Sequence, residues 1–296
     1  MKKLIEKFSK DQQFLIISVA VILMLVFYSI FFMIPIFNGV LGSFYEWNPI
    51  EGTKDFIGLG NYKFLFSSPL FWISLKNTLL FTIISVVGRT VLGLLLAVGL
   101  HSITKGKDYL RSSYFLPVIM PIVAVSIVWK WIYHPRMGLL NMFLMMFGIT
   151  GENWLGNSNL ALPSVLMMTI WKDVGYAVII FMAALLNVPK SLYEAAEIDG
   201  ANKSQIFFKI VLPTIKPTII FIVITSLISY FQSFVQIFIM TKGGPGTATY
   251  VLSYLIYNEA FVRYNFGYAS AVAVVLFLII IFITVIQKKF IMGEDD

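Results

Sequence analysis

The sequence predicts an all-helical, polytopic membrane protein with six transmembrane helices. Of its 296 residues, 58% are hydrophobic and only 12% are charged, and the mean hydropathy of +0.85 lies well above that of ordinary soluble domains. Six stretches stay apolar over the roughly 20 residues that a helix needs to cross the hydrocarbon core of a bilayer. We find no internal repeat, linker or low-complexity tract, and therefore expect a single domain over residues 1–296.

The six predicted spans alternate with segments that carry most of the charged residues. The spans are Phe14–Phe37, Trp72–Leu100, Ser112–Tyr133, Ala161–Leu186, Thr214–Met240 and Gly267–Gln287. The first follows a lysine-rich start, but its apolar run is longer than that of a signal peptide and no small-residue cleavage site follows it. We therefore expect it to be a retained helix.

Lysine and arginine are concentrated on one predicted side of the membrane: before the first span and after the second, fourth and sixth. Because positively charged loops stay in the cytoplasm, this bias predicts that both termini are cytoplasmic. It also explains the net charge of +7 better than nucleic-acid binding does. On the opposite side, "MGLLNMFLMMFGI" at Met137–Ile149 is apolar but too short to cross, so we expect a short helix along the outer interface.

Several classes of chemistry are excluded by residues that the chain lacks. There is no cysteine, and the two histidines, His101 and His134, are far apart in sequence, so nothing indicates a metal site. The phosphate-binding pattern G-x-x-x-x-G-K-[ST] is absent, and the nearest fragment, Lys105–Asp108, lacks the hydroxyl residue. No cluster of acid, base and nucleophile suggests catalysis, so we expect a non-catalytic protein.

One polar segment on the cytoplasmic side, "SLYEAAEIDGANKSQIFFKIVLP" at Ser191–Pro213, carries strong local signals. Ser191 and Glu194 fit a capping box that would start a helix, and Gly200 offers the left-handed conformation that ends one. Asn202 with Gln205 repeats the start signal, and Pro213 is expected to stop the second helix.

The first helix of residues 191–213 combines small and acidic side chains. Ala195 and Ala196 allow another protein to approach the backbone closely, and Glu194, Glu197 and Asp199 can meet its lysines or arginines. This combination favours a plug that fits into a partner protein. The alternative is a self-contained connector in which Glu194 only caps the helix. A DNA-binding helix-turn-helix fits poorly, because an acidic helix repels phosphate.

Residues 191–213 resemble the EAA loop of the permease subunits of binding-protein-dependent ABC importers, and from this resemblance we call them the coupling loop. The matching positions are Glu194, Ala195, Ala196, Gly200, Ile210, Leu212 and Pro213, without a departure in spacing. Four further patterns are similar to the sugar-importing branch, which includes the maltose and glycerol-phosphate permeases. They are "FIGLGNY" at 56–62, "YFLPVIMP" at 114–121, "WKWIYHPRMGLLN" at 129–141 and "TKGGPGTAT" at 241–249.

The resemblance implies a type I ABC importer permease fold in a bacterial cytoplasmic membrane. It implies that Glu194, Ala195, Ala196, Asp199 and Gly200 couple the chain to a separate ATPase. ATP and magnesium would then be bound by that ATPase, and no cofactor by this chain. The implied partners are two cytoplasmic ATPase subunits, a second related permease, an extracellular solute-binding protein and a sugar.

Polar residues inside predicted spans are the candidates for the solute pathway, because each is costly in a bilayer. Arg89 and Asp173 fall at comparable depths, which allows them to pair. In "SYFQSFVQ", Tyr230, Ser233 and Gln236 follow helical spacing, and aromatic rings with hydroxyl and amide groups suit sugars. The candidate pathway residues are Ser229, Tyr230, Gln232, Ser233, Gln236, Trp171, Lys172, Asp173, Tyr176 and Asn77.

Each pathway candidate has an alternative reading as an interhelical hydrogen-bonding group. Within the resemblance, the solute-binding segment maps by position onto Ser229, Tyr230 and Ser233. The excess of positive charge within the spans hints at an acidic or phosphorylated saccharide.

Two rival functions deserve comparison with an importer. An ion-coupled secondary transporter would use Asp173 and Arg89, but such folds show inverted repeats and broken helices, which the sequence does not indicate. A membrane enzyme would need a catalytic cluster, which the sequence lacks.

Overall fold

The computed structural model describes residues 10–102 and 107–292. They form two compact units: residues 10–65 with Glu259–Val274 (unit 1), and Phe66–Asn258 with residues 275–292 (unit 2). The lysine-rich start at residues 1–9 and the first half of the fragment compared with a phosphate loop, Lys105 and Gly106, lie outside the described residues. The single domain expected from the sequence remains a prediction.

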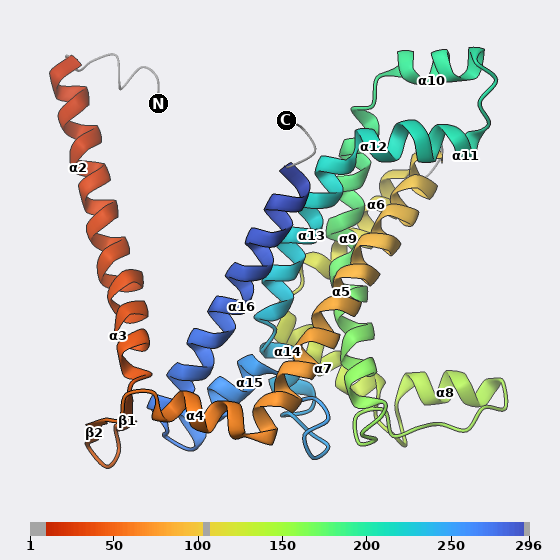
Figure 1. Ribbon diagram of the computed structural model, residues 1–296. Helices are drawn as coiled ribbons and strands as arrows, with labels where there is room; N and C mark the ends of the chain where they lie inside the picture. Colours follow the sequence, from red (N-terminus) through yellow and green to blue (C-terminus); the bar gives the residue numbers. More distant parts are fainter. Residues whose placement is uncertain (1–9, 103–106, 293–296) are drawn as a thin grey trace. The chain divides into compact units, whose positions relative to one another are not determined.

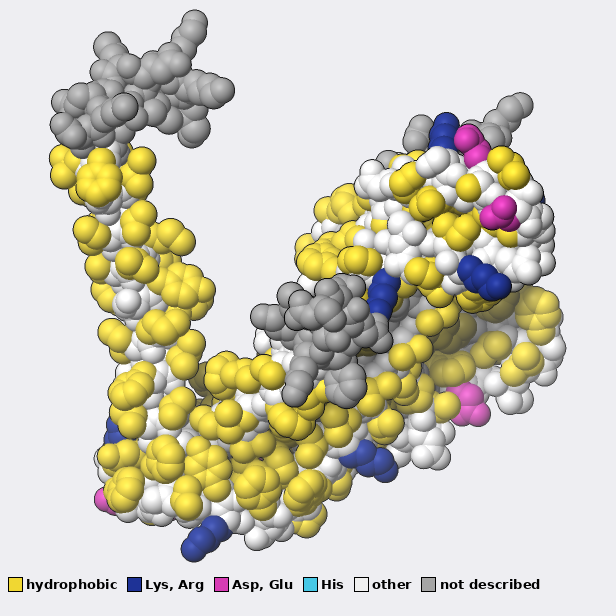
Figure 2. All heavy atoms as spheres, turned by 45° about the horizontal axis from the view of Figure 1, so that its top comes forward, with side chains coloured by type: hydrophobic (Ala, Val, Ile, Leu, Met, Phe, Trp, Pro, Cys, Tyr) yellow, Lys and Arg dark blue, Asp and Glu magenta, His cyan; other side chains and the backbone are white. Residues whose placement is uncertain are grey.

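Unit 1 begins with a long apolar helix made of α2 (Lys10–Tyr28), η1 (Ser29–Met33) and α3 (Ile34–Gly42) (Figure 1). The π turn η1 precedes Pro35, which has no backbone N–H, and Ile34 N–H donates to the Ser29 carbonyl five residues back. Hydrophobic side chains cover this helix and are exposed (Figure 2). A helix that is apolar all round is typical of a membrane environment.

A small hairpin follows, which was not expected from the sequence. Strands β1 (Tyr45–Asn48) and β2 (Thr53–Phe56) pair antiparallel, with Tyr45 opposite Phe56. Asn61, in α4 (Gly60–Ser67), donates from Nδ2 to the carbonyls of Ser43 and Tyr45, at 2.9 Å each. These two bonds fix the turn that connects the first helix to the hairpin.

Unit 2 is built from helices. They are α5 (Pro69–Ser102), α6 (Lys107–Ile119), α7 (Ile122–Ile132), α8 (Leu139–Met146), α9 (Ala161–Leu186), α10 (Lys190–Ile198), α11 (Lys203–Ile206), η2 (Phe207–Val211), α12 (Leu212–Thr214), α13 (Lys216–Phe231), α14 (Val235–Met240) and α15 (Leu252–Tyr257). Both η3 (Asn258–Val262) and α16 (Phe266–Met292) run through the two units. Within unit 2, α10 and α11 lie at one end and α8 at the other (Figure 1).

Four continuous helices among the described residues are long and apolar enough to cross a membrane: Phe14–Gly42, Pro69–Leu100, Ala161–Leu186 and Phe266–Gln287. Two bent pairs, α6 with α7 (105°) and α11–α12 with α13 (62°), bring the number to six if each pair is one span. The helix predicted at Met137–Ile149 is confirmed as α8. The all-helical prediction thus holds, apart from the hairpin.

The third and fifth predicted spans are not continuous helices, so the expectation of unbroken spans was wrong. The third breaks between Ile119 and Ile122, because Pro121 cannot donate a backbone hydrogen bond. The fifth bends at Ile215, and α13 ends at Phe231, before α14 starts at Val235. Its predicted range, Thr214–Met240, therefore contains two helices.

Small residues let the helices of unit 2 approach closely. A Cβ added to Gly175 on α9 would lie 1.9 Å from the carbonyl oxygen of Tyr114 on α6. One added to Gly93 on α5 would lie 2.6 Å from the Cβ of Ala177 on α9. Close backbone contact of this kind is how helices pack inside membranes, and it fixes α5, α6 and α9 as the frame of the unit.

Candidate functional site

The start of the coupling loop differs from the prediction. Helix α10 begins at Lys190 with Pro189 as its N-cap, and no side chain caps it. Ser191 therefore lies inside the helix rather than at the N-cap, where its hydroxyl could accept the amide of Glu194. The capping box predicted for Ser191 and Glu194 is wrong, because the preceding proline already presets the backbone angle for a helix start.

The end of α10 and the start of α11 agree with the prediction. Gly200 has a φ of +76°, Gly200 N–H donates to the Glu197 carbonyl at 3.1 Å, and Ala201 N–H donates to the Ala196 carbonyl at 2.9 Å. This is a Schellman motif. Asn202 and Gln205 form the predicted capping box, with reciprocal bonds of 2.8 and 2.9 Å.

Contrary to the prediction, Pro213 does not stop the second helix of the loop. The chain stays helical through η2 and α12 to Thr214, and the bend lies at Ile215. In η2, Leu212 N–H donates to the carbonyl of Phe207, five residues back. This wider turn accommodates the proline ring, which would clash with the carbonyl four residues earlier in a regular α-helix.

The coupling loop is held to unit 2 by an apolar core. Ala196, Ile206 and Val211 are buried with Leu185 at the end of α9, in one cluster. Of the predicted coupling residues, Glu194, Ala195, Asp199 and Gly200 are exposed, whereas Ala196 packs inside its own chain. Ile198 is 86% exposed, and charged side chains of both signs lie at this end of the unit (Figure 2).

A cavity of about 320 Å³ lies beneath α10. Tyr193, Glu197 and Lys203 contribute its polar lining, and Phe207 and Val98 are among its apolar residues. Burial raises the pKa of the Tyr193 phenol above its ordinary value of 10.0. The phenol is therefore neutral at physiological pH.

A second group of polar residues lies where α5, α9 and α13 meet, and most of its side chains are buried. The Tyr230 hydroxyl lies 3.2 Å from Oδ2 of Asp173, whose Oδ1 lies 3.5 Å from Nζ of Lys172. Arg89 donates to Oγ of Ser226 at 3.0 Å, and its guanidinium carbon lies 4.7 Å from the centre of the Tyr176 ring.

Arg89 and Asp173 do not form the ion pair that their comparable depths in the spans allowed. No ion pair joins them among the described residues; Asp173 contacts Lys172 and Tyr230, and Arg89 lies 6.0 Å from the centre of the Tyr230 ring. Tyr230 thus separates the two charges. The predicted pathway set did not include Arg89 and Ser226, which form part of this group. The charge of Arg89 within a predicted span was a signal that could have placed it in the set.

Lys172 also contacts the break in the third span. Its Nζ donates to the carbonyl of Val118 at 3.4 Å, in the last turn of α6. The carbonyls of a last helical turn lack intrahelical partners, and here the chain turns away before Ile122 can supply one. A cation is also favoured at this negative end of a helix. Lys172 therefore stabilises the broken geometry of α6 and α7.

Some of the remaining pathway candidates are buried and others are exposed. Asn77 donates from Nδ2 to carbonyls of Thr247, Ala248 and Tyr250, at 2.9 to 3.2 Å, and so ties α5 to that loop. Ser233 and Gln236 are buried, and the Ser233 carbonyl accepts the hydroxyl of Ser253. Tyr230, Ser233 and Gln236 do not share a helical face, because α13 ends at Phe231.

Two candidates on α13, Ser229 and its C-cap Gln232, are exposed, as are Trp171 and Tyr176 on α9. Within this single chain, these four side chains are the ones available to a solute or to another protein.

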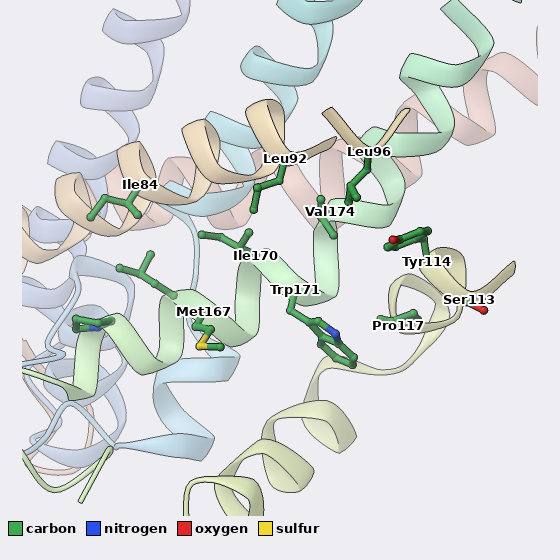
Figure 3. A pocket seen from close by; sticks show the side chains of 12 residues that line it. Ile84, Leu92, Leu96, Ser113, Tyr114, Pro117, Met167, Ile170, Trp171 and Val174 are labelled. Atoms are coloured by element: carbon green, nitrogen blue, oxygen red, sulfur yellow. The ribbon is translucent and has the colours of Figure 1, made fainter. Parts of the chain in front are cut away.

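An apolar groove of about 890 Å³ runs between α5, α6 and α9. Trp171 points into it, with Ile170 and Val174 from α9, Leu92 from α5 and Pro117 from α6 (Figure 3). Ser113 and Tyr114 are its polar residues. Because sugars need several hydrogen-bonding groups, this lining suits a lipid chain or an apolar helix better.

Comparison with known proteins identifies a family that matches most of the chain. Residues 89–291 match the family described as "Binding-protein-dependent transport system inner membrane component". The chain is 37% identical to the "Probable ABC transporter permease protein YurN" of Bacillus subtilis over 265 residues, which cover 88% of this chain and 91% of the relative. It is 34% identical to the "Multiple sugar-binding transport system permease protein MsmF" of Streptococcus mutans, covering 88% and 89%.

The fold also matches a solved structure. A chain of a bacterial alginate ABC transporter, crystallised in complex with an alginate pentasaccharide-bound periplasmic protein, superposes with a TM-score of 0.82. The match covers 94% of each chain at 22% identity. The likeness supports the type I importer fold predicted from the coupling loop.

Proposed function

This chain belongs to the family of binding-protein-dependent transport system inner membrane components, and from that membership we propose that it is the permease of an ATP-driven saccharide importer. The name of the Streptococcus relative, a multiple sugar-binding system, supports a saccharide as cargo. The chain is a multi-pass, non-catalytic membrane subunit of an ABC transporter, as its relatives are. An ion-coupled carrier is set aside, because the family depends on a binding protein.

One observation carries the proposed coupling role of residues 191–213. The loop is rigidly attached to its own chain through Ala196, Ile206 and Val211, while Glu194 and Ile198 project outward. An isoleucine that is 86% exposed on a polar loop favours a partner surface that covers it. We assign this partner as a separate ATPase, which binds ATP and magnesium. Glu194, Ala195, Asp199 and Gly200 would face it, and Ala196 would anchor the loop.

The connection from the coupling loop into the membrane supports the same proposal. α12 leads into α13 through the bend at Ile215, and α13 carries Ser226 and Tyr230. These two residues contact Arg89 on α5 and Asp173 on α9. A displacement of the loop would therefore reach the centre of the unit through α13 and change how α5 and α9 are held together.

The proposed solute pathway uses the exposed polar residues of the same helices. Ser229 and Gln232 on α13 and Tyr176 on α9 are exposed in this chain, so a solute can reach them from outside it. Asn77 and Lys172 have protein partners and serve the fold in this arrangement. Because these residues lie on the outside of one chain, a second, related permease would close the pathway, and a solute-binding protein would deliver the saccharide.

The experiment is reconstitution in liposomes with and without the partners from the host. We expect the chain to purify with an ATPase and a second permease, and saccharide uptake to require ATP and the binding protein. The positive-inside orientation, with the coupling loop in the cytoplasm, is tested with the variants Glu51→Cys and Ser191→Cys. A membrane-impermeant thiol reagent added outside the cell should label Glu51→Cys and leave Ser191→Cys unlabelled. Uptake by this chain alone, driven by an ion gradient, would overturn the proposal.

A further inference from the structure

A cavity of about 600 Å³ lies at the end of unit 2 opposite the coupling loop, where α7 faces α14. Its lining residues are Ile127, Lys130, Trp131, His134, Met137 and Ile239. They belong largely to the pattern "WKWIYHPRMGLLN", which the proposed function leaves without a role. Ile127, Lys130 and Trp131 lie on one face of α7, and His134 follows the end of that helix. The volume is within the range of small-molecule sites.

Lys130 brings a positive charge to this cavity without a compensating acid. Its Nζ donates to the Ile239 carbonyl at 3.5 Å, the outer limit of a hydrogen bond. No carboxylate lies within ion-pair distance of it in the part of the chain that the structure describes, and none lines the cavity. An ammonium group has three N–H donors, so two remain available to a ligand.

His134 offers a second donor whose orientation is fixed. Its Nδ1 accepts the backbone N–H groups of Arg136 at 3.3 Å and Met137 at 3.2 Å. The neutral ring therefore carries its proton on Nε2, which becomes a donor. Gly138 keeps this turn tight, because an added Cβ would lie 2.4 Å from the carbonyl oxygens of His134 and Ile132.

The rest of the lining suits the ring of a sugar. Trp131 is 76% exposed, and aromatic rings pack against the C–H faces of sugars. Ile127 and Met137 add apolar surface beside the two donors. We propose that this cavity binds a saccharide through its acidic group, a carboxylate, phosphate or sulfonate, held by Lys130 and His134. This inference rests on the proposed function and specifies its substrate class.

The test uses the complete importer in phosphatidylcholine nanodiscs. Saturation-transfer NMR would measure the dissociation constants of a glucuronosyl-glucose disaccharide and its neutral glucosyl-glucose counterpart, and of glucose 6-phosphate and glucose. We expect at least one acidic probe to bind about tenfold more tightly than its neutral counterpart, since a hydrogen bond to a charged group contributes about that factor. Equal binding within both pairs would overturn the inference.

Three variants locate the effect. Lys130→Met should abolish the preference for the acidic probe, whereas Lys130→Arg should retain it. Arg136→Met is the matched control, because it removes the same charge from a neighbouring residue that does not line the cavity, and it should leave the preference unchanged. A preference that survives Lys130→Met would contradict the assignment.

An anionic lipid headgroup has the same chemistry as the acidic group of a saccharide and must be separated from it. Native mass spectrometry of the importer in phosphatidylglycerol nanodiscs should count the same number of bound lipids for the wild type and Lys130→Met. Loss of one lipid with an unchanged saccharide preference would overturn the saccharide site. Import of neutral saccharides without an acidic preference would refute this inference alone, whereas absence of any saccharide uptake would refute the proposed function.

Discussion

The hydroxyl of Tyr230 and Oδ2 of Asp173 lie 3.2 Å apart and join α13 to α9. Tyr230 is 2% exposed, so its hydroxyl has little access to solvent as an alternative partner. Because α13 directly follows the coupling loop, this contact would carry movement of the loop to the middle of α9, away from the end of α9 on which the loop itself packs.

Tyr230→Phe removes the hydroxyl and keeps the ring, so it tests this contact. Losing a hydrogen bond to a charged group costs about 1.5–3 kcal/mol, and we expect ATP-dependent saccharide uptake to fall at least tenfold while basal ATP turnover changes little. Tyr109→Phe is the control, because Tyr109 is 78% exposed. An equal fall in basal and saccharide-stimulated turnover would indicate a packing role instead.

Glu194→Lys tests the proposed ATPase contact. The residue is exposed on α10, so reversing its charge should leave membrane insertion intact. We expect loss of ATPase co-purification and of uptake, as measured on the detergent-solubilised complex and in liposomes. Glu51→Lys also reverses an exposed charge, in the turn of the hairpin, and should behave as the wild type. Unchanged uptake in Glu194→Lys would refute the contact.

Gly200→Ala tests the end of α10. At a φ of +76° a side chain costs about 1–2 kcal/mol, so we expect a lower melting temperature and weaker coupling of ATP turnover to uptake. Gly39→Ala is the control: its backbone is helical, and an added Cβ meets nothing within 4 Å. Its melting temperature should stay equal or rise. If both variants melt alike, the conformation of Gly200 does not limit stability.

Glu259, on η3 outside the predicted spans, should make stability depend on pH. Burial raises the pKa of its carboxyl above 4.5, and Arg263, 3.2 Å away, partly lowers it. Between 4.5 and the raised pKa, the folded state therefore binds more protons than the unfolded state, so stability falls as pH rises through that window.

We expect the melting temperature of the wild type to rise as pH is lowered from 7 towards 5, and Glu259→Gln to reduce that rise. Glu51→Gln, at an exposed position, should keep the wild-type dependence. Identical pH profiles for the wild type and Glu259→Gln would contradict the buried carboxyl as the cause.

Signals within a few residues were the most reliable guides to the coupling loop. Gly200 and the pair Asn202 and Gln205 were predicted correctly, because each motif depends only on the backbone beside it. The predictions for Ser191 and Pro213 were wrong because another local feature took over the role assigned to each. Pro189 starts α10 in place of Ser191, and the π turn η2 lets the helix continue past Pro213.

The sequence by itself determined the membrane class, the approximate position of the spans and the turn between the two helices of residues 191–213, because apolar length and capping motifs depend on neighbouring residues alone. Only the tertiary structure decided that Tyr230 stands between Arg89 and Asp173, that Lys172 reaches the broken end of α6, and that Lys130 and His134 share a cavity. These contacts join residues on different helices or across a helix break, and their partners depend on how the helices bend and pack, which no local pattern specifies.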